Sequence, residues 1–422
     1  MKHIYIILML ISIQILIGQE SKNVLFLGNS YTTSNNLPSL IQQTAASVGD
    51  TFTFDSNTPG GYRLKGHASN TTSINKIQAG NWDYVVLQEQ SQFPSFPDAQ
   101  VETEVYPYAT QLSNLIKQHN PCASTTFYMT WGRENGDAGN CSGWPPVCTY
   151  EGMDDLLRQR YQTMANNNNG ITSPVGVVWR YLRTNHPTLD LYSGDGSHPS
   201  LTGSYAGAIT FYCTIFRKDP TLVTFNSTLN AADADIIKNA VKEVVFNDFS
   251  EWNIGKYDPV ANFTYTNTDE NYTFNNTSDY GVSYLWDFGD GNTSTDENPN
   301  HTYTSIGNFT ITLTTSNCGK ISITSQDITI TSLNIEDNQL ADNNFYLVEN
   351  PVSDYIKINS NLFILKKYQF RITNTIGQVV IKTNSNLNSS QEINISNLSN
   401  GLYILNIFNE DQKVFKVKIL KD

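Results

Sequence analysis

The stretch VLFLGNSY, residues Val24–Tyr31, decides the fold of the first half of this chain of 422 residues. Its four consecutive apolar residues predict a buried strand, and Gly28 and Asn29 are turn formers that end it. A serine on the sharp turn after a strand projects its hydroxyl at the carboxyl edge of an α/β sheet, where such folds bind ligands. We therefore expect Ser30 to act as a nucleophile, although a serine here could also cap the next helix.

Residues 22 to about 250 alternate short apolar runs with helical patterns, which is typical of a parallel α/β sheet. The expected strands are Val24–Leu27, Thr51–Phe54, Tyr84–Leu87 and Thr126–Thr130. The expected helices are Leu37–Val48, Val101–Gln118, Met153–Met164 and Thr202–Phe216.

A second segment, DGSHP at Asp195–Pro199, supplies the groups that a serine nucleophile needs. We expect it to open the last helix of the same domain. His198 is the candidate general base, and Asp195, three residues earlier, can hold the imidazole in the required tautomer. A metal site would need further ligands at suitable spacing, and none is evident, so we expect neither a metal nor a cofactor.

The order of these two segments resembles that of the SGNH (GDSL-like) hydrolases, in which the nucleophile comes first and Asp-x-x-His last. The resemblance implies a flavodoxin-like, three-layer parallel sheet over residues 22–250 and ester hydrolysis through an acyl-Ser30 intermediate. It also implies an oxyanion hole built from the Ser30 amide, a glycine and an Asn. For the glycine we favour Gly61, with Gly60 nearly as good, although the pair could form a simple turn.

The segment that follows the third expected strand differs in this chain from the family pattern. Where an Asn would follow the third strand, the sequence has Gln88, whose longer side chain also carries an NH2 donor. We assign Gln88 the role of the Asn in the oxyanion hole. The alternative is a strand-terminal amide that bonds to nearby backbone.

Three residues after the fourth strand and in the next loop are candidates for substrate binding. Trp131 could stack on a sugar ring, and Arg133 could bind a carboxylate or sulfate on an acidic glycan. Trp144, in the next loop, could extend the same wall of the site. For each aromatic residue, packing in the core or at the rim is an equally good explanation.

Beyond Lys256 the sequence changes to short segments rich in Thr and Asn. The motifs YLWDFGDG (Tyr284–Gly291), NPNHTY (Asn298–Tyr303) and GNFTITL (Gly307–Leu313) resemble those of a PKD domain. The resemblance implies an immunoglobulin-like β-sandwich over residues 257–332, which acts as a spacer or makes weak contacts with polysaccharide.

Residues 340–422 contain the motifs YLVENPV (Tyr346–Val352), NTIGQVV (Asn374–Val380) and LSNGLYI (Leu398–Ile404). In this order they resemble the carboxy-terminal sorting domain of the type IX secretion system. The resemblance implies a second β-sandwich and the type IX secretion machinery as a partner. A plain structural sandwich is the alternative.

The amino terminus and the composition bear on the location of the protein. Lys2 and His3 precede the apolar run Ile4–Ile17 and Gly18, which predicts a signal peptide at residues 1–18. The net charge of −13 disfavours nucleic acid and anionic membranes as partners, and no later stretch is apolar enough to span a bilayer. We therefore expect a secreted or cell-surface protein.

Five cysteines are consistent with an oxidising compartment. Cys141 and Cys148 could close a surface loop, and Cys122 and Cys213 are a possible second pair.

Together these features predict a secreted serine esterase that hydrolyses O-acetyl or similar ester groups, with polysaccharide or a small acyl ester as its substrate. Two alternatives stay open: a non-catalytic glycan-binding or adhesion protein on a hydrolase scaffold, and an SGNH lipase or arylesterase.

Overall fold

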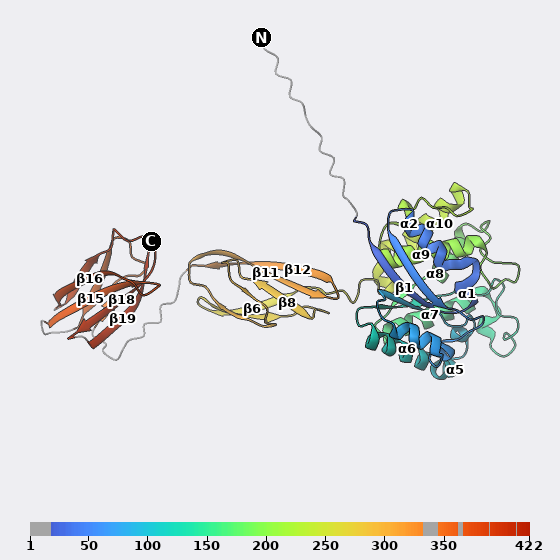
Figure 1. Ribbon diagram of the computed structural model, residues 1–422, viewed down its shortest axis with the longest axis horizontal. Coiled ribbons are helices and arrows are strands. Elements are labelled where there is room, and N and C mark those ends of the chain that lie inside the picture. Colours follow the sequence, from blue (N-terminus) through green and yellow to red (C-terminus); the bar gives the residue numbers. More distant parts are fainter. Residues whose placement is uncertain (1–17, 332–344, 362–365, 388, 411) are drawn as a thin grey trace, which may run out of the picture. The chain divides into compact units, whose positions relative to one another are not determined.

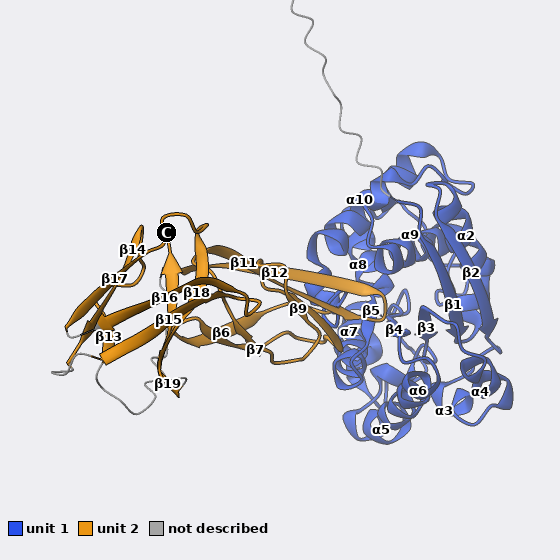
Figure 2. Cartoon of the chain, turned by 60° about the vertical axis from the view of Figure 1, so that its left-hand side comes forward, with its two compact units in different colours: residues 1–258 blue, residues 259–422 orange. Residues whose placement is uncertain are grey.

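The computed structural model describes residues 18–331, 345–361, 366–387, 389–410 and 412–422. The chain divides into two compact units, residues 1–258 and 259–422 (Figure 2). The predicted signal peptide, apart from Gly18, lies outside the described residues. None of the helices in the described segments is long and apolar enough to cross a membrane.

The described part of the first unit is built on a sheet of five parallel strands in the order β2-β1-β3-β4-β5. The strands are β1 (Ser21–Leu27), β2 (Thr51–Asn57), β3 (Tyr84–Leu87), β4 (Ser124–Tyr128) and β5 (Ile171–Ser173). This strand order is that of the flavodoxin-like, doubly wound fold, which places ligands at the carboxyl ends of the strands where the order reverses. The predicted fold class of the first domain is confirmed.

Helices cover both faces of this sheet, so the unit has three layers. Figure 1 shows α2, α8, α9 and α10 on one face and α5, α6 and α7 on the other. The α-helices are α1 (Ser30–Thr33), α2 (Leu37–Ala46), α3 (Leu64–His67), α4 (Thr71–Gln78), α5 (Asp98–Glu104), α6 (Tyr106–His119), α7 (Tyr150–Asn167), α8 (Val175–Asn185), α9 (Leu201–Phe216) and α10 (Ala231–Val244). Short 3-10 helices are η1 (Ser34–Asn36), η2 (Phe93–Ser95), η3 (Pro145–Cys148), η4 (Pro220–Leu222) and η5 (Phe246–Trp252).

The structure corrects three details of the predicted order. The single helix expected at Val101–Gln118 is two helices, because Pro107 starts a new helix after the break at Val105. The strand β5 was not among the predicted strands, and it is only three residues long. The segment Asp195–Pro199 does not open the last helix, because α10 follows α9 and packs its apolar side against the unit.

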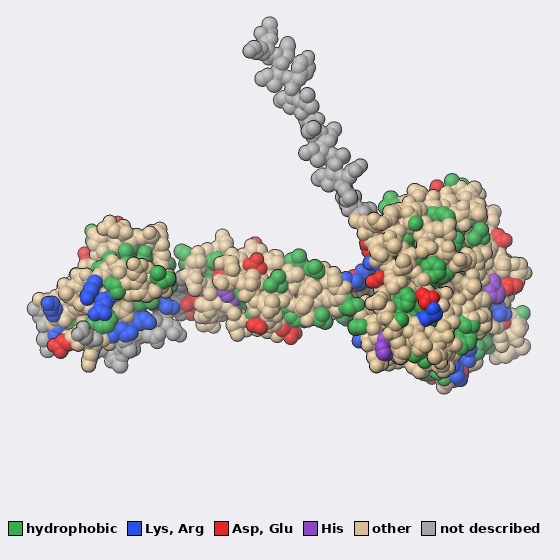
Figure 3. Space-filling view, viewed as in Figure 1, with side chains coloured by type: hydrophobic (Ala, Val, Ile, Leu, Met, Phe, Trp, Pro, Cys, Tyr) green, Lys and Arg blue, Asp and Glu red, His purple; other side chains and the backbone are tan. Residues whose placement is uncertain are grey.

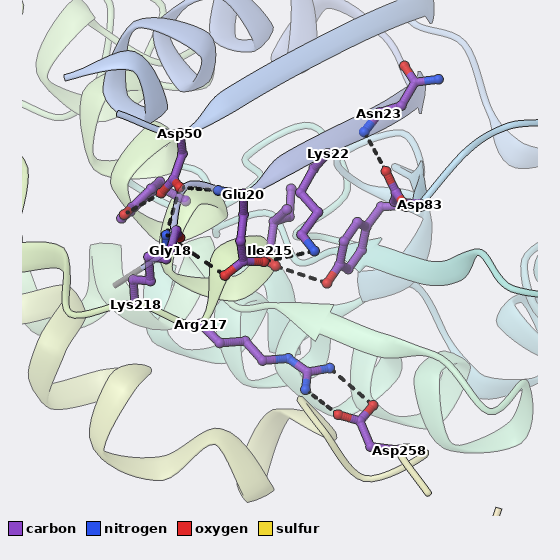
Figure 4. Close-up of polar contacts among 12 residues, drawn as sticks. Gly18, Glu20, Lys22, Asn23, Asp50, Asp83, Ile215, Arg217, Lys218 and Asp258 are labelled. Atoms are coloured by element: carbon purple, nitrogen blue, oxygen red, sulfur yellow. Dashed lines mark hydrogen bonds and ion pairs between the residues drawn. The ribbon is translucent and has the colours of Figure 1, made fainter. Parts of the chain in front are cut away.

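Polar contacts fix the amino edge of the sheet, where β1 begins (Figure 4). The ammonium of Lys218 donates to Oδ1 of Asp50 at 2.6 Å and to the carbonyl of Gly18 at 3.2 Å. The backbone N–H of Glu20 donates to the same Asp50 oxygen at 2.9 Å. The carboxylate of Asp50 is fully buried, so this pairing compensates its loss of hydration. Because the strands are parallel, the carboxyl edge, with Ser30, is the opposite one.

The cysteines of this unit bear out one expected pair and exclude the other. Cys141 and Cys148 form a disulfide bond across a separation of seven residues. Cys213 is a free, buried thiol on α9, whose side chains lie almost entirely inside the core. The predicted Cys122–Cys213 pair is therefore wrong.

The second unit is made of antiparallel strands throughout its described sheets. Residues 263–330 form the sheets β10-β7-β6 and β12-β11-β8-β9, and residues 345–421 form β13-β14-β17 and β16-β15-β18-β19. Each pair of sheets encloses its own hydrophobic cluster, around Trp286 in the first and Phe370 in the second. The two predicted β-sandwiches are thus present. Their strands are β6 (Phe263–Thr268), β7 (Asn271–Asn276), β8 (Ser283–Asp287), β9 (Thr293–Ser294), β10 (Asn300–Thr302), β11 (Gly307–Asn317), β12 (Lys320–Ile330), β13 (Phe345–Leu347), β14 (Tyr355–Ser360), β15 (Lys366–Asn374), β16 (Val379–Leu387), β17 (Ser390–Asn394), β18 (Gly401–Asn409) and β19 (Gln412–Lys421).

Three cationic side chains and one asparagine occupy paired positions across one sheet of the last sandwich. Arg371 on β15 pairs with Lys382 on β16 and with Asn406 on β18, which pairs in turn with Lys416 on β19. Figure 3 shows Lys and Arg side chains gathered on this sandwich. The acidic excess of the whole chain is therefore not spread evenly over its modules.

Candidate active site

The turn that follows β1 presents Ser30 as the first residue of α1. Asn29 precedes it in an extended conformation (φ −145°, ψ −151°) and caps the helix, because its side-chain oxygen accepts the N–H of Tyr31 at 3.1 Å. Ser30 itself is half-buried. The side chain therefore stands at the carboxyl edge of the sheet, as the sequence predicts.

Ser30, His198 and Asp195 lie in one hydrogen-bonded chain. The Nε2 atom of His198 is 2.9 Å from Oγ of Ser30, and its Nδ1 atom is 2.5 Å from Oδ2 of Asp195. Because an ionised carboxylate only accepts hydrogen bonds, Nδ1 carries the proton of the neutral ring. The lone pair of Nε2 is then directed at the serine hydroxyl, which is the arrangement needed to remove its proton.

The loop around Asp195 keeps this carboxylate ionised. Burial opposes its ionisation, but hydrogen bonds from the His198 ring, from the N–H groups of His198 and Ser197, and from the Ser193 hydroxyl outweigh that effect. Together they hold the pKa of Asp195 well below its usual range. The carboxylate is thus in the charged form that orients the imidazole and stabilises an imidazolium.

Two aromatic side chains attach the loop that carries His198 (the histidine loop) to the turn that carries Ser30 (the nucleophile turn). The hydroxyl of Tyr31 lies 2.6 Å from Oγ of Ser197, and Nε1 of Trp131 donates to the carbonyl of Ser197 at 3.1 Å. The Tyr31 ring also meets the ring of His198 edge-on, with centroids 5.2 Å apart. Tyr31 and Trp131 therefore support the position of His198 through the side chain and the backbone of the preceding residue, Ser197.

The expectation that Trp131 stacks on a sugar is wrong. Its ring is stacked against Tyr31 (4.9 Å, 7°) and against Trp179 (3.7 Å, 11°). Trp131 is only 1% exposed. With its neighbours already covering the ring, no face is left for a ligand, and the residue belongs to the core beneath the histidine loop.

The other two candidates for substrate binding are partly exposed but already have partners. The guanidinium of Arg133 forms an ion pair with the fully buried carboxylate of Asp137 at 3.2 Å. The indole N–H of Trp144 donates to the carbonyl of Ser95 at 2.9 Å. Contact of Arg133 or Trp144 with substrate stays a prediction.

The predicted glycines lie in the loop after β2. Gly61 has a left-handed backbone (φ 66°), and a Cβ atom added at Gly60 or Gly61 would meet nothing within 4 Å. The side-chain NH2 of Asn29 donates to the carbonyl of Tyr62 at 2.9 Å, so this loop is joined to the nucleophile turn. An open glycine backbone beside the nucleophile turn fits the predicted oxyanion role, which stays a prediction.

The structure contradicts the predicted role of Gln88 as an oxyanion donor. Gln88 is fully buried. Its side-chain nitrogen donates one hydrogen to Oδ1 of Asn29 and the other to the carbonyl of Glu89, both at 2.8 Å. Because both hydrogens are used inside the protein, neither is available to a developing oxyanion. The alternative reading of the sequence, an amide bonded to nearby groups, is the one that the structure supports.

Sequence reasoning missed several residues that shape the site, among them Tyr31, Ser197 and His67. Tyr31 and Ser197 are direct neighbours of predicted catalytic residues, and that adjacency was the available signal. His67 is fully buried, and its ring nitrogens lie 2.9 Å from the carbonyl of Gly28 and 2.7 Å from Oγ of Ser73. No spacing pattern in the sequence indicates these contacts.

The first unit thus combines a flavodoxin-like fold with a serine, histidine and aspartate in hydrogen-bonded order. Within the second unit, the PKD domain model matches residues 256–331, and the model of the secretion system C-terminal sorting domain matches residues 350–421. Both predicted resemblances are confirmed. The sorting domain indicates a secreted or cell-surface protein.

Parts of the chain are also similar to solved structures. A protein from Slackia heliotrinireducens assigned to the SGNH hydrolases is 24% identical, over 46% of this chain and 97% of its own, with a TM-score of 0.39. A DUF4886 family protein from Bacteroides uniformis is 16% identical, over 54% of this chain and 95% of its own, with a TM-score of 0.45. The PKD1 domain of the Vibrio cholerae metalloprotease PrtV is 38% identical, over 18% of this chain and 99% of its own, with a TM-score of 0.17.

Proposed function

We propose that this protein is a secreted serine ester hydrolase that acts through an acyl-Ser30 intermediate. The observation that carries the proposal is the continuous hydrogen-bonded chain from Oγ of Ser30 through His198 to Asp195, with distances of 2.9 and 2.5 Å. A nucleophile within hydrogen-bond reach of a base, which is itself oriented by a third group, is the signature of nucleophilic catalysis.

The residues act in the following order. Nε2 of His198 takes the hydroxyl proton as Oγ of Ser30 attacks the acyl carbonyl carbon, and Asp195 stabilises the imidazolium that forms. When the tetrahedral intermediate collapses, His198 gives the proton to the leaving alcohol. The same imidazole then removes a proton from water as the water oxygen attacks the carbonyl carbon of the acyl-Ser30 ester. When this second intermediate collapses, His198 returns the proton to Oγ of Ser30 and the carboxylic acid leaves.

The oxyanion needs hydrogen-bond donors that are fixed before the reaction. Within the described part of the chain, no acceptor receives the N–H of Ser30, whereas the N–H groups of Asn29 and Tyr31 are both bonded. We assign the Ser30 amide as one donor and the Gly61 amide as the second. Each such donor contributes about 3–4 kcal/mol to stabilising the transition state.

For the substrate, we propose O-acetyl or similarly small acyl groups on polysaccharide. The sorting domain supports this choice, because it indicates that the protein meets its substrate outside the cell. The PKD match supports it through the polysaccharide contact which that resemblance implies. Arg133 and Trp144 are the candidates for contact with the glycan.

The decisive experiment compares the full mature chain with Ser30→Ala and with Ser39→Ala, a matched control on α2. Hydrolysis of p-nitrophenyl acetate and covalent labelling by a fluorophosphonate are measured for all three proteins. We expect turnover and labelling in the wild type and in Ser39→Ala, and neither in Ser30→Ala. If the folded wild type neither turns over nor labels, the serine esterase is refuted and a non-catalytic glycan-binding protein becomes the leading explanation.

The substrate class is tested separately by the release of acetate from acetylated polysaccharides. We expect kcat/KM on acetylated polysaccharide to exceed that on long-chain p-nitrophenyl esters. Turnover that increases with acyl chain length, without acetate release from polysaccharide, would instead identify a lipase or arylesterase.

A further inference from the structure

The turn that carries the nucleophile is held from within the core by the side chain of Gln88, at the end of β3. Oε1 of Gln88 accepts the backbone N–H of Asn29 at 3.0 Å and the hydroxyl of Thr32 at 2.9 Å. Its Nε2 atom donates to Oδ1 of Asn29 and to the carbonyl of Glu89. Three of these four hydrogen bonds therefore go to Asn29 and Thr32, which precede and follow Ser30 in the turn.

The orientation of this amide is fixed by its partners. The backbone N–H of Asn29 can only donate, so the atom it meets must be the oxygen of Gln88. Both N–H groups of the amide then point at oxygen acceptors, Oδ1 of Asn29 and the carbonyl of Glu89. A fully satisfied, fully buried amide has a single low-energy position, because any rotation would leave a buried polar group without a partner.

Asn29 completes the connection between Gln88 and the nucleophile. It forms two hydrogen bonds with Gln88, one through its backbone N–H and one through Oδ1. The same Oδ1 accepts the N–H of Tyr31, on the far side of Ser30. Its NH2 group donates to the carbonyl of Tyr62, next to Gly61. Asn29 thus joins Gln88 to both parts of the backbone that we assign to the oxyanion hole.

The residue at position 28 shows how close this contact is. A Cβ atom added to Gly28 would lie 2.6 Å from Oε1 of Gln88 and 2.7 Å from Oγ1 of Thr32, which is closer than real Cβ atoms approach. Glycine is therefore needed at position 28 for Gln88 to reach the turn.

We propose that Gln88 is a positioning residue, which fixes the Ser30 hydroxyl and amide through Asn29 and does not itself bind the oxyanion. The helix α1 is only four residues long and cannot hold this geometry alone. With the N–H groups of Asn29 and Tyr31 engaged by the amide pair, the Ser30 N–H is the donor of the turn left for the oxyanion. This inference rests on the proposed serine esterase function.

The test measures kcat, KM and the rate of fluorophosphonate labelling for Gln88→Met, Asn29→Ala and the double variant. We expect each single variant to lose about ten- to a hundredfold in kcat, because a small displacement of a nucleophile has an effect of that size. KM should change less than twofold. The rate of labelling should fall with kcat, but all of the protein should become labelled in the end. A merely structural role would instead reduce the fraction of protein that can be labelled.

The double variant separates positioning from direct catalysis. If Gln88 acts only through Asn29, the double variant is no slower than the slower single variant, because both changes break the same connection. Losses that multiply in the double variant, or a wild-type kcat in Gln88→Met, would overturn the proposal. The matched control is Gln42→Met on α2, which removes one amide bond to the carbonyl of Phe52 and should leave kcat unchanged.

Two further measurements keep the outcome decisive. If Gln88→Met does not fold, Thr32→Val serves in its place. It removes one of the two bonds that hold Oε1 of Gln88 against the N–H of Asn29, so the contact with Asn29 loosens and a three- to tenfold lower kcat is expected. An unchanged kcat in Thr32→Val would then contradict the proposal. If the wild type does not label at all, the proposed esterase function fails. If the wild type labels and the Gln88 variant labels equally fast, only the positioning role of Gln88 fails.

Discussion

Replacement of His67 by glutamine should remove an acid-sensitive part of the stability of this protein. The ring is fully buried, with Nε2 at 2.9 Å from the carbonyl of Gly28 and Nδ1 at 2.7 Å from Oγ of Ser73. A carbonyl only accepts, so Nε2 carries the proton and Nδ1 accepts from the Ser73 hydroxyl. Burial lowers the pKa of His67 from 6.5 to about 4, against the smaller effect of the Gly28 bond.

The size of the effect follows from that difference in pKa. Between pH 6.5 and pH 4 the unfolded chain binds a proton at His67 that the folded protein does not bind. The free energy of unfolding therefore rises with pH across this window, and the contribution is complete above pH 6.5. As the pH falls, the contribution declines by about 2 kcal/mol at pH 5 and about 3 kcal/mol at pH 4.

Urea unfolding at pH 4.0 to 7.5 measures this contribution. The difference in the free energy of unfolding between wild type and His67→Gln should shrink by about 3 kcal/mol from pH 7 to pH 4, since all other titrating groups cancel. Ser73→Ala is the control, because it keeps the imidazole and should retain most of the pH dependence of the wild type. Parallel curves for wild type and His67→Gln would refute the reasoning.

Two other variants probe the surroundings of the site. Tyr31→Phe removes the hydroxyl that bonds Ser197, and kcat for p-nitrophenyl acetate should fall roughly fivefold, equivalent to about 1 kcal/mol, whereas an unchanged kcat would contradict the supporting role. Burial raises the pKa of Glu89 to about 7. The folded protein therefore keeps a proton that the unfolded chain releases from pH 4.5 upward. Relative to Glu89→Gln, the free energy of unfolding of the wild type in urea should fall by about 3 kcal/mol between pH 4.5 and pH 8. A difference in the free energy of unfolding that does not change with pH would contradict this.

Local sequence patterns were sufficient to predict four of the five described strands of the first domain and the identity of its reactive groups. Apolar runs such as Val24–Leu27 form buried strands wherever they fall in a parallel sheet, so local pattern was sufficient for them. The motifs of the two sandwiches are likewise local, because turn residues and alternating apolar positions act over a few residues. Ser30 and the segment Asp195–His198 were found by the chemistry of their side chains and by their order.

The roles of the amides and aromatic rings of the site depend on contacts that form only in the folded protein. The amide hydrogens of Gln88 are bonded inside the protein, one of them to Asn29, which is distant in the chain. Trp131 is a core residue, because the distant Trp179 covers one face of its ring. His67 contacts Gly28 across 39 residues, which no local pattern encodes. An amide or a ring has the same intrinsic chemistry at a rim and in a core. Its role is set by whether folding leaves a donor or a face uncovered, and that depends on partners that the chain brings together only when it folds.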